Sequence, residues 1–129
     1  MPGFEPFAYA LLRVVPDAER GECLNVGVVL FCRRGRYLEA RTHLDPDRLR
    51  ALSAGTDAHT IAAYLQTLER IAAGAPEAGP VAQEDPSARF GWLVAPASTV
   101  VQPSPVHTGL TADPAGTMER LMERLVLVR

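Results

Sequence analysis

Six polar residues in two distant stretches of the chain are of types that bind or act on small anions. Arginine donates paired N–H groups to phosphates and carboxylates, and a neighbouring glutamate can hold such an arginine in place. Histidine serves near neutral pH as a base or, when protonated, as an anion ligand, and serine is a conceivable nucleophile. Four of the residues lie near the start of the chain and two near its end: Arg13, Arg20, Glu22, Asn25, Ser104 and His107. They would form one site only if the fold brings the two stretches together.

The first stretch contains a charged loop, residues 16–22, between two apolar segments. In a binding site, Arg20 would contact the anion, and Glu22 or Glu19 would orient the guanidinium group. Alternatively, Arg20 and Glu22 pair with each other in a solvated turn, where an ion pair contributes little to stability.

Asn25 stands in an apolar segment between Leu24 and Val26. Its amide must find hydrogen-bond partners, because an unpaired buried polar group costs about 1–3 kcal/mol. Gly27 follows two residues later, on the same side of an extended strand, and its missing side chain allows a backbone or a ligand to approach closely. Arg13, on the neighbouring strand, would reach the same side. The structural alternative is that Asn25 caps a nearby loop and Gly27 marks a β-bulge; both interpretations stay open.

The second stretch, residues 102–109, combines two prolines with Ser104 and His107. Here His107 would act as a base or an anion ligand, whereas Ser104 lacks the Gly-x-Ser-x-Gly turn that exposes a nucleophile. The alternative is a stiff loop whose hydroxyl groups satisfy its own backbone, because proline offers no N–H donor. The two prolines also exclude this stretch from the centre of a sheet.

Several kinds of chemistry are excluded by residues that the chain lacks. The chain contains no lysine, so it has no Schiff-base lysine, lysine base or phosphate-loop lysine. No Cys or His pair has the spacing of zinc ligands, and no glycine motif for a dinucleotide or a phosphate is present. We therefore expect no cofactor and no metal, and no motif predicts an enzyme.

Composition and charge are typical of a soluble globular protein. A length of 129 residues, 47% of them hydrophobic and 22% charged, predicts a single domain over residues 1–129. The first residues have neither a basic region nor a hydrophobic run, which predicts no signal peptide and no membrane span. Two cysteines expected as free thiols, Cys23 and Cys32, favour a reducing cytoplasm.

The net charge of −2 argues against broad nucleic-acid binding, which depends on basic surface. A local basic patch remains as a weaker alternative. Its members would be Arg33, Arg34, Arg36 and Arg41.

Periodic patterns predict the elements that must position these residues. Apolar residues on both sides of residues 7–15 and 23–32 predict two covered strands, and residues 37–43 form a third. Helices are predicted after Asp45 and Asp113, aspartates that fit the N-cap position, and from about Asp57 to Ala73, where apolar residues recur at three- and four-residue steps. Residues 90–95 and 99–102 alternate like strands. The expected fold class is α+β, an antiparallel sheet of about five strands in the order βββααββα, with helices packed on one face.

The same stretches resemble a known family of short bacterial proteins, the domain of unknown function 3037. The similarity lies in RVVPD at 13–17, RGE at 20–22, NVGVVLF at 25–31, LDPDRL at 44–49, WLVAP at 92–96 and QPSPVHTG at 102–109. Members of this family are often encoded beside a protein that resembles a kinase of the HipA type. The resemblance therefore implies a kinase-like partner protein, and it implies no catalytic role for any residue.

Two functional hypotheses follow. The first is a cytoplasmic interaction or regulatory module whose partner is the kinase-like protein that the resemblance implies. The alternative is a small enzyme or binder of an anionic ligand that carries a phosphate or a carboxylate, with the six polar residues united in one pocket.

Overall fold

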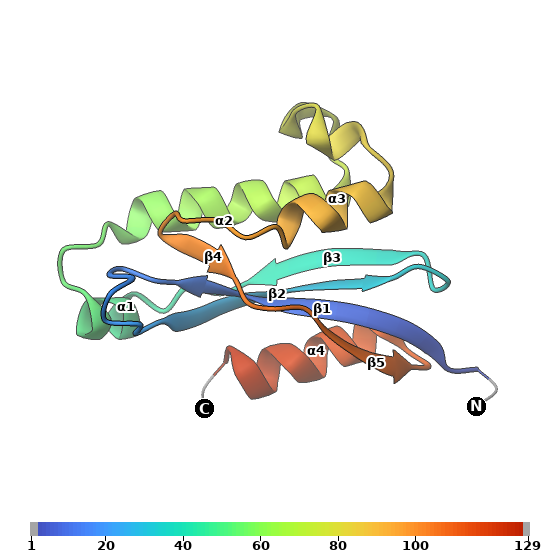
Figure 1. Cartoon of the computed structure of the whole chain (residues 1–129), viewed down its shortest axis with the longest axis horizontal. Helices are drawn as coiled ribbons and strands as arrows, with labels where there is room; N and C mark the ends of the chain where they lie inside the picture. Colours follow the sequence, from blue (N-terminus) through green and yellow to red (C-terminus); the bar gives the residue numbers. More distant parts are fainter. Residues whose placement is uncertain (1–2, 128–129) are drawn as a thin grey trace.

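A five-stranded antiparallel sheet forms the centre of the molecule, and helices lie on both of its faces (Figure 1). The structure is a computed structural model that describes residues 3–127. The strand order is β3-β2-β1-β4, and β5 pairs with the other part of the same edge of β1. The strands are β1 (Glu5–Val14), β2 (Leu24–Cys32), β3 (Tyr37–Thr42), β4 (Val101–Pro103) and β5 (His107–Thr111). The α+β class is confirmed, as is the chain order of three strands, helices, two strands and a closing helix.

The hairpin of β1 and β2 contains a β-bulge. Leu12 pairs with Gly27 and Arg13 pairs with Asn25, so Val26 is an extra residue in β2. An extra residue reverses the alternation of side chains beyond it. Asn25 and Gly27 therefore point to opposite faces of the sheet, and the expectation that they share a face is wrong.

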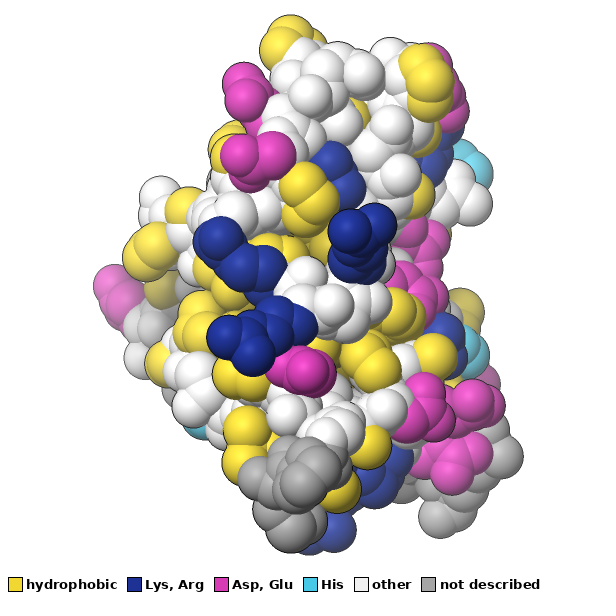
Figure 2. All heavy atoms as spheres, turned by 90° about the vertical axis from the view of Figure 1, so that its right-hand side faces the viewer, with side chains coloured by type: hydrophobic (Ala, Val, Ile, Leu, Met, Phe, Trp, Pro, Cys, Tyr) yellow, Lys and Arg dark blue, Asp and Glu magenta, His cyan; other side chains and the backbone are white. Residues whose placement is uncertain are grey.

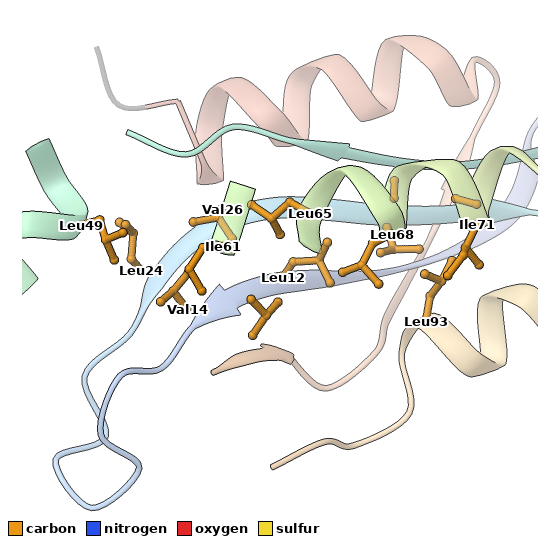
Figure 3. Packing of buried hydrophobic residues seen from close by; sticks show 14 of the residues in the cluster. Leu12, Val14, Leu24, Val26, Leu49, Ile61, Leu65, Leu68, Ile71 and Leu93 are labelled. Carbon is orange, nitrogen blue, oxygen red and sulfur yellow. The ribbon is translucent and has the colours of Figure 1, made fainter. Parts of the chain in front are cut away.

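One face of the sheet is covered by α1 (Pro46–Leu52), α2 (Ala58–Ala73) and α3 (Pro86–Leu93). The side chains of Asp45, Asp57 and Asp85 accept backbone N–H groups at the starts of these helices, as N-caps do. The apolar stripe of α2 packs onto Leu12 and Val14 of β1 and onto their neighbours in β2 (Figure 3). Its members are Ile61, Leu65, Leu68 and Ile71.

The opposite face is covered by α4 (Pro114–Leu125), which Figure 1 shows below the sheet. Met118 and Met122 of α4 pack against Phe7 and Leu11 of β1. The expectation that all helices pack on one face is therefore wrong. The physical reason is that β1 and β2 are apolar on both sides, so each side needs a cover that excludes water.

In the segment expected as a strand at residues 90–95, residues 90–93 belong to the helix α3 and Val94 is its C-cap. Asp85 Oδ1 accepts the N–H of Ala88 at 2.8 Å, and Pro86 occupies the first helical position. The ring of Phe90 packs 5.3 Å from the ring of Phe31 in β2, and Leu93 is buried in the core. The fifth strand is instead β5, which pairs with β1 at the sheet edge. Pro103 lies in β4 and Pro105 in the bend before β5, so both prolines are outside the centre of the sheet.

Both cysteines are free thiols, and they lie in different surroundings. Cys32, at the end of β2, is buried under α4, whereas Cys23, just before β2, is exposed. Among residues 3–127, no helix is long and apolar enough to cross a membrane.

Candidate functional site

Ser104 is part of the architecture of the sheet. The chain bends between β4 and β5, and at this bend the N–H of Ser104 donates to the carbonyl of Leu11 at 2.8 Å. The Ser104 hydroxyl accepts the N–H of Leu11 at 2.8 Å and donates to the carbonyl of Pro105 at 2.9 Å. The side chain is 3% exposed. Its hydroxyl is thus committed to backbone partners, as the structural alternative predicts.

His107 lies on the exposed edge strand β5, opposite Tyr9 of β1. The two rings lie 5.2 Å apart between centroids. The hydrogen bonds of Ser104 are made to Leu11 and Pro105 rather than to His107. The two residues therefore do not form a base–nucleophile pair in this structure.

Arg13 and Asn25 are brought together by the register of β1 and β2. Gln102 of β4 is the cross-strand partner of Arg13 on its other side. The Asn25 amide donates to the carbonyl of Leu125 at 3.2 Å and so binds the C-terminal end of α4. Arg13 Nε is buried with no hydrogen-bond partner among the described residues. Gly27 thus lies at the bulge, as the structural alternative predicts, whereas Asn25 has a structural partner at the end of α4 rather than in the nearby loop that this alternative expected.

Arg20 and Glu22 pair with each other in the exposed loop between β1 and β2. Arg20 Nε donates to Glu22 Oε1 at 2.7 Å, and this hydrogen bond raises the pKa of Arg20. The pair lines a small hollow of about 230 Å³ together with Asp17 and Ser53, and the other four candidates are not in its wall. Of the six candidates, the structure brings Arg13 next to Asn25 and Arg20 next to Glu22. It does not unite them in one pocket with Ser104 and His107.

A different set of residues surrounds the largest hollow described, which has a volume of about 860 Å³. Arg33 and Arg36 come from the turn between β2 and β3, and Arg89 comes from α3. We call this hollow the arginine pocket. Figure 2 shows the face that carries this turn and the start of α3, with dark-blue basic side chains gathered near its centre. Arg33 and Arg36 belong to the basic patch expected from the sequence, whereas Arg89, more than fifty residues further along the chain, does not.

The three arginines of this pocket have no acidic partner. No carboxylate among residues 3–127 lies within 4 Å of their guanidinium groups. Arg33 Nη2 donates to the Ser87 hydroxyl at 3.2 Å. Arg89 donates to the carbonyls of Glu84 at 2.7 Å and Ala72 at 3.5 Å, and its Nε is buried without a partner. These neutral partners hold the guanidinium groups of Arg33 and Arg89 in place without neutralising their positive charge.

Arg36 adopts a backbone conformation that ordinary residues avoid. Its φ is +52°, in the left-handed region, which costs a residue with a side chain roughly 1–2 kcal/mol. Gly35, the residue before it, does not have positive φ. Gly35 is needed for another reason, because a Cβ atom there would lie 3.0 Å from Cys32 Sγ and 3.1 Å from Pro114 Cγ. A strained residue that lines a pocket points to function at that position.

Within the described part of the chain, Asp85 is the one acidic residue in the wall of the arginine pocket. Its Oδ1 atom already accepts the N–H of Ala88. The pocket wall contains three guanidinium groups and one carboxylate, so its charge is positive. The chain as a whole has 15 acidic and 13 basic residues and is slightly negative. Such a pocket can bind anions through charge-assisted hydrogen bonds.

The other two arginines of the expected basic patch have acidic partners. Arg34 Nη1 lies 3.8 Å from Glu5 Oε2, and Arg41 Nη2 donates to Glu39 Oε1 at 3.0 Å. Tyr37 also donates to Glu39, and its pKa is raised by burial and by this carboxylate. Arg41 pairs in register with Val28, a residue buried under α4, and so faces away from the arginine pocket. No group of three metal-binding side chains occurs within the described residues.

Comparison with known proteins gives one match. The model of a family described as protein of unknown function (DUF3037) matches residues 9–126, which include all six sequence candidates and all three arginines of the pocket. No curated protein and no solved structure shows a significant match. Because the family model covers nearly the whole chain, the resemblance is confirmed, and the chain belongs to the DUF3037 family.

Proposed function

We propose that the chain is a binding module that takes a small anionic ligand, one that carries a phosphate or a carboxylate, in the arginine pocket. The observation that carries this proposal is the group of three guanidinium groups that have no acidic partner among residues 3–127 and surround a hollow of about 860 Å³. Like charges that face one hollow repel each other, and a bound anion relieves this repulsion. The ligand is the phosphate- or carboxylate-bearing anion of the alternative hypothesis, but the proposed site differs from the six sequence candidates.

The expected affinity for a bare anion is low. A hydrogen bond to a charged group contributes about 1.5–3 kcal/mol, and two such bonds contribute roughly 4 kcal/mol, which corresponds to a Kd of about 1 mM. Inorganic phosphate or pyrophosphate at millimolar concentration is therefore a suitable first probe. Added salt should weaken the binding, because the pocket is open to solvent and its charges are screened.

Titration of the full chain with pyrophosphate, followed by amide chemical shifts in low salt, tests the proposal. We expect shifts at residues 33–36 and 85–89. The variant Arg36→Gly should lose most of the binding and remain as stable as the parent, because glycine adopts positive φ without strain. The matched control is Arg120→Ala, which removes one positive charge from an exposed position on α4.

Two results would overturn this proposal. One is the absence of any shift at tens of millimolar pyrophosphate. The other is an equal loss of affinity in Arg36→Gly and Arg120→Ala, which would mean that net charge, rather than the pocket, attracts the anion.

A second candidate function is the interaction module with a kinase-like partner, and exposed aromatic side chains favour it. Tyr64 of α2 and Trp92 of α3 are 40% and 45% exposed and line a second hollow of about 210 Å³ with an apolar wall. Exposed aromatic residues beside an apolar hollow are typical of protein interfaces. The kinase-like partner is the one that the resemblance implied, and the two free cysteines support the reducing cytoplasm as the proposed location.

Co-expression with the kinase-like neighbour, followed by size-exclusion chromatography, tests this candidate. We expect one co-eluting complex that Trp92→Ala weakens and Arg120→Ala does not. Separate elution of the two proteins at micromolar concentration would contradict the interaction.

A further inference from the structure

The arginines make up only part of the wall of the arginine pocket. The remainder is largely apolar and includes Phe31, Leu38, Ala72 and Ala88. A volume of about 860 Å³ lies within the roughly 300–1,000 Å³ of pockets that hold whole organic ligands. An inorganic anion at the arginines would leave the apolar wall in contact with water, so the wall indicates a ligand with an apolar body attached to its anionic group.

We propose that this ligand is a nucleoside monophosphate, with its phosphate at the arginines and its base against Phe31. The inference rests on the proposed function and specifies the ligand class for the same pocket. The proposal is that the pocket binds this ligand, and it includes no chemical reaction.

The charge of the pocket favours a phosphate monoester over a carboxylate. Arg33, Arg36 and Arg89 provide three positive charges, and Asp85 provides one negative charge whose Oδ1 is already bound to the Ala88 N–H. A phosphate monoester carries nearly two negative charges near neutral pH and three acceptor oxygens, whereas a carboxylate carries one charge and two oxygens. The phosphate therefore satisfies more of the available donors.

The aromatic wall favours a flat base over an aliphatic chain. Phe31 is partly exposed, and the ring of Phe90 in α3 packs against it, with ring centroids 5.3 Å apart and planes inclined by 32°. A supported, partly exposed ring is a surface on which a base can stack, and such stacking is sequence-tolerant because every base has a π-face.

An acceptor is also present for the sugar. Asp85 uses Oδ1 for the Ala88 N–H, which leaves Oδ2 to accept from a hydroxyl group. A carboxylate that accepts from ribose hydroxyls is a common device of nucleotide sites. In this proposal the arginines bind the phosphate, Asp85 binds the sugar and Phe31 contacts the base.

The test compares four main probes on the full chain by calorimetry or chemical-shift titration: AMP, ribose 5-phosphate, adenosine and inorganic phosphate. GMP, CMP and O-phosphotyrosine are titrated in the same way as comparison ligands. We expect AMP to bind at least tenfold more tightly than ribose 5-phosphate, the difference that stacking supplies. Adenosine should bind at least tenfold more weakly than AMP, because it lacks the phosphate. GMP and CMP should bind within a few-fold of AMP.

Two variants locate the contacts. Phe31→Leu, which keeps an apolar side chain of similar size, should reduce AMP affinity about five- to tenfold and leave ribose 5-phosphate unchanged. Trp92→Leu is the matched control, because Trp92 is an exposed aromatic residue outside the wall of this pocket. It should leave both affinities unchanged.

Three outcomes would overturn the inference, and they differ in what they leave standing. Equal affinity for AMP and ribose 5-phosphate would remove the nucleotide and keep the proposed anion site. Tighter binding of O-phosphotyrosine than of AMP would assign the aromatic wall to a phosphorylated side chain instead. Failure of all four probes to bind would remove both the inference and the proposed function.

Discussion

Replacement of Ser104 by alanine should destabilise the protein and leave anion binding intact. The Ser104 hydroxyl accepts the buried N–H of Leu11 at 2.8 Å. Alanine offers no acceptor, and the substitution leaves that N–H unpaired in a site that is 3% exposed. Ser104 lies outside the wall of the arginine pocket, so its loss should not affect ligand affinity.

The magnitude follows from the two hydrogen bonds of this hydroxyl. An unpaired buried donor costs about 1–3 kcal/mol. The other bond, to the carbonyl of Pro105, adds little because Pro105 is exposed and its carbonyl can bind water. We therefore expect a loss of about 2 kcal/mol in the free energy of unfolding, which lowers Tm by roughly 6–10 °C in a chain of this size.

Urea denaturation with linear extrapolation measures the loss, and amide hydrogen exchange locates it. The midpoint should fall by about 1 M with an unchanged slope, since the slope reflects the surface exposed on unfolding. Exchange at the Leu11 amide should accelerate more than at other amides of β1. Ser98→Ala is the matched control at an exposed serine, with an expected change within about 0.5 kcal/mol.

The reasoning about this bend would be refuted if Ser104→Ala were as stable as the parent and its Leu11 amide remained protected. A loss of AMP or pyrophosphate binding at unchanged stability would also refute it. That result would return Ser104 to the candidate site.

Three further predictions concern stability. Gly27→Ala should lower the free energy of unfolding by about 1–3 kcal/mol, because a Cβ atom there would lie 2.8 Å from the carbonyl oxygen of Arg41. Gly91→Ala, where a Cβ atom meets open space, should raise the free energy of unfolding by up to about 1 kcal/mol in urea denaturation. Asn25→Ala should cost about 0.5–1.5 kcal/mol and accelerate hydrogen exchange at the end of α4, whose last carbonyl the amide binds. The hydrogen bonds of Asp57, the N-cap of α2, lower the pKa of its carboxyl group. The ionised carboxylate therefore stabilises the fold above the unfolded pKa of 3.8, and this stabilisation is lost as pH falls through the lower folded pKa. Asp57→Asn should remove this part of the acid dependence in thermal melts at pH 2–6.

Local patterns were enough to predict much of the fold. Alternating apolar residues identified β1 and β2, and aspartate followed by a stripe at three- and four-residue steps identified α1, α2 and α4. These features depend on side-chain period and on caps, which involve residues a few positions apart. The expectation of helices on one face was wrong although β1 and β2 are apolar on both sides, and the structure shows that α4 covers the second face.

Patterns of a few residues were ambiguous where two structures fit them. Phe90, Trp92 and Val94 alternate like a strand, yet the Asp85 cap and the contact between Phe90 and Phe31 favour a helix. The six sequence candidates were of suitable types, but the register of the sheet gave Ser104 and Asn25 structural partners far away in the chain.

The sequence by itself determined the amphipathic elements, their caps and the absence of lysine chemistry, because each of these depends on residue types at short separations. Only the tertiary structure decided the bulge at Val26, the cover of the second face by α4, and the meeting of Arg33 and Arg36 with Arg89. Such meetings depend on strand register and helix packing, which join residues tens of positions apart and leave no local periodic signal.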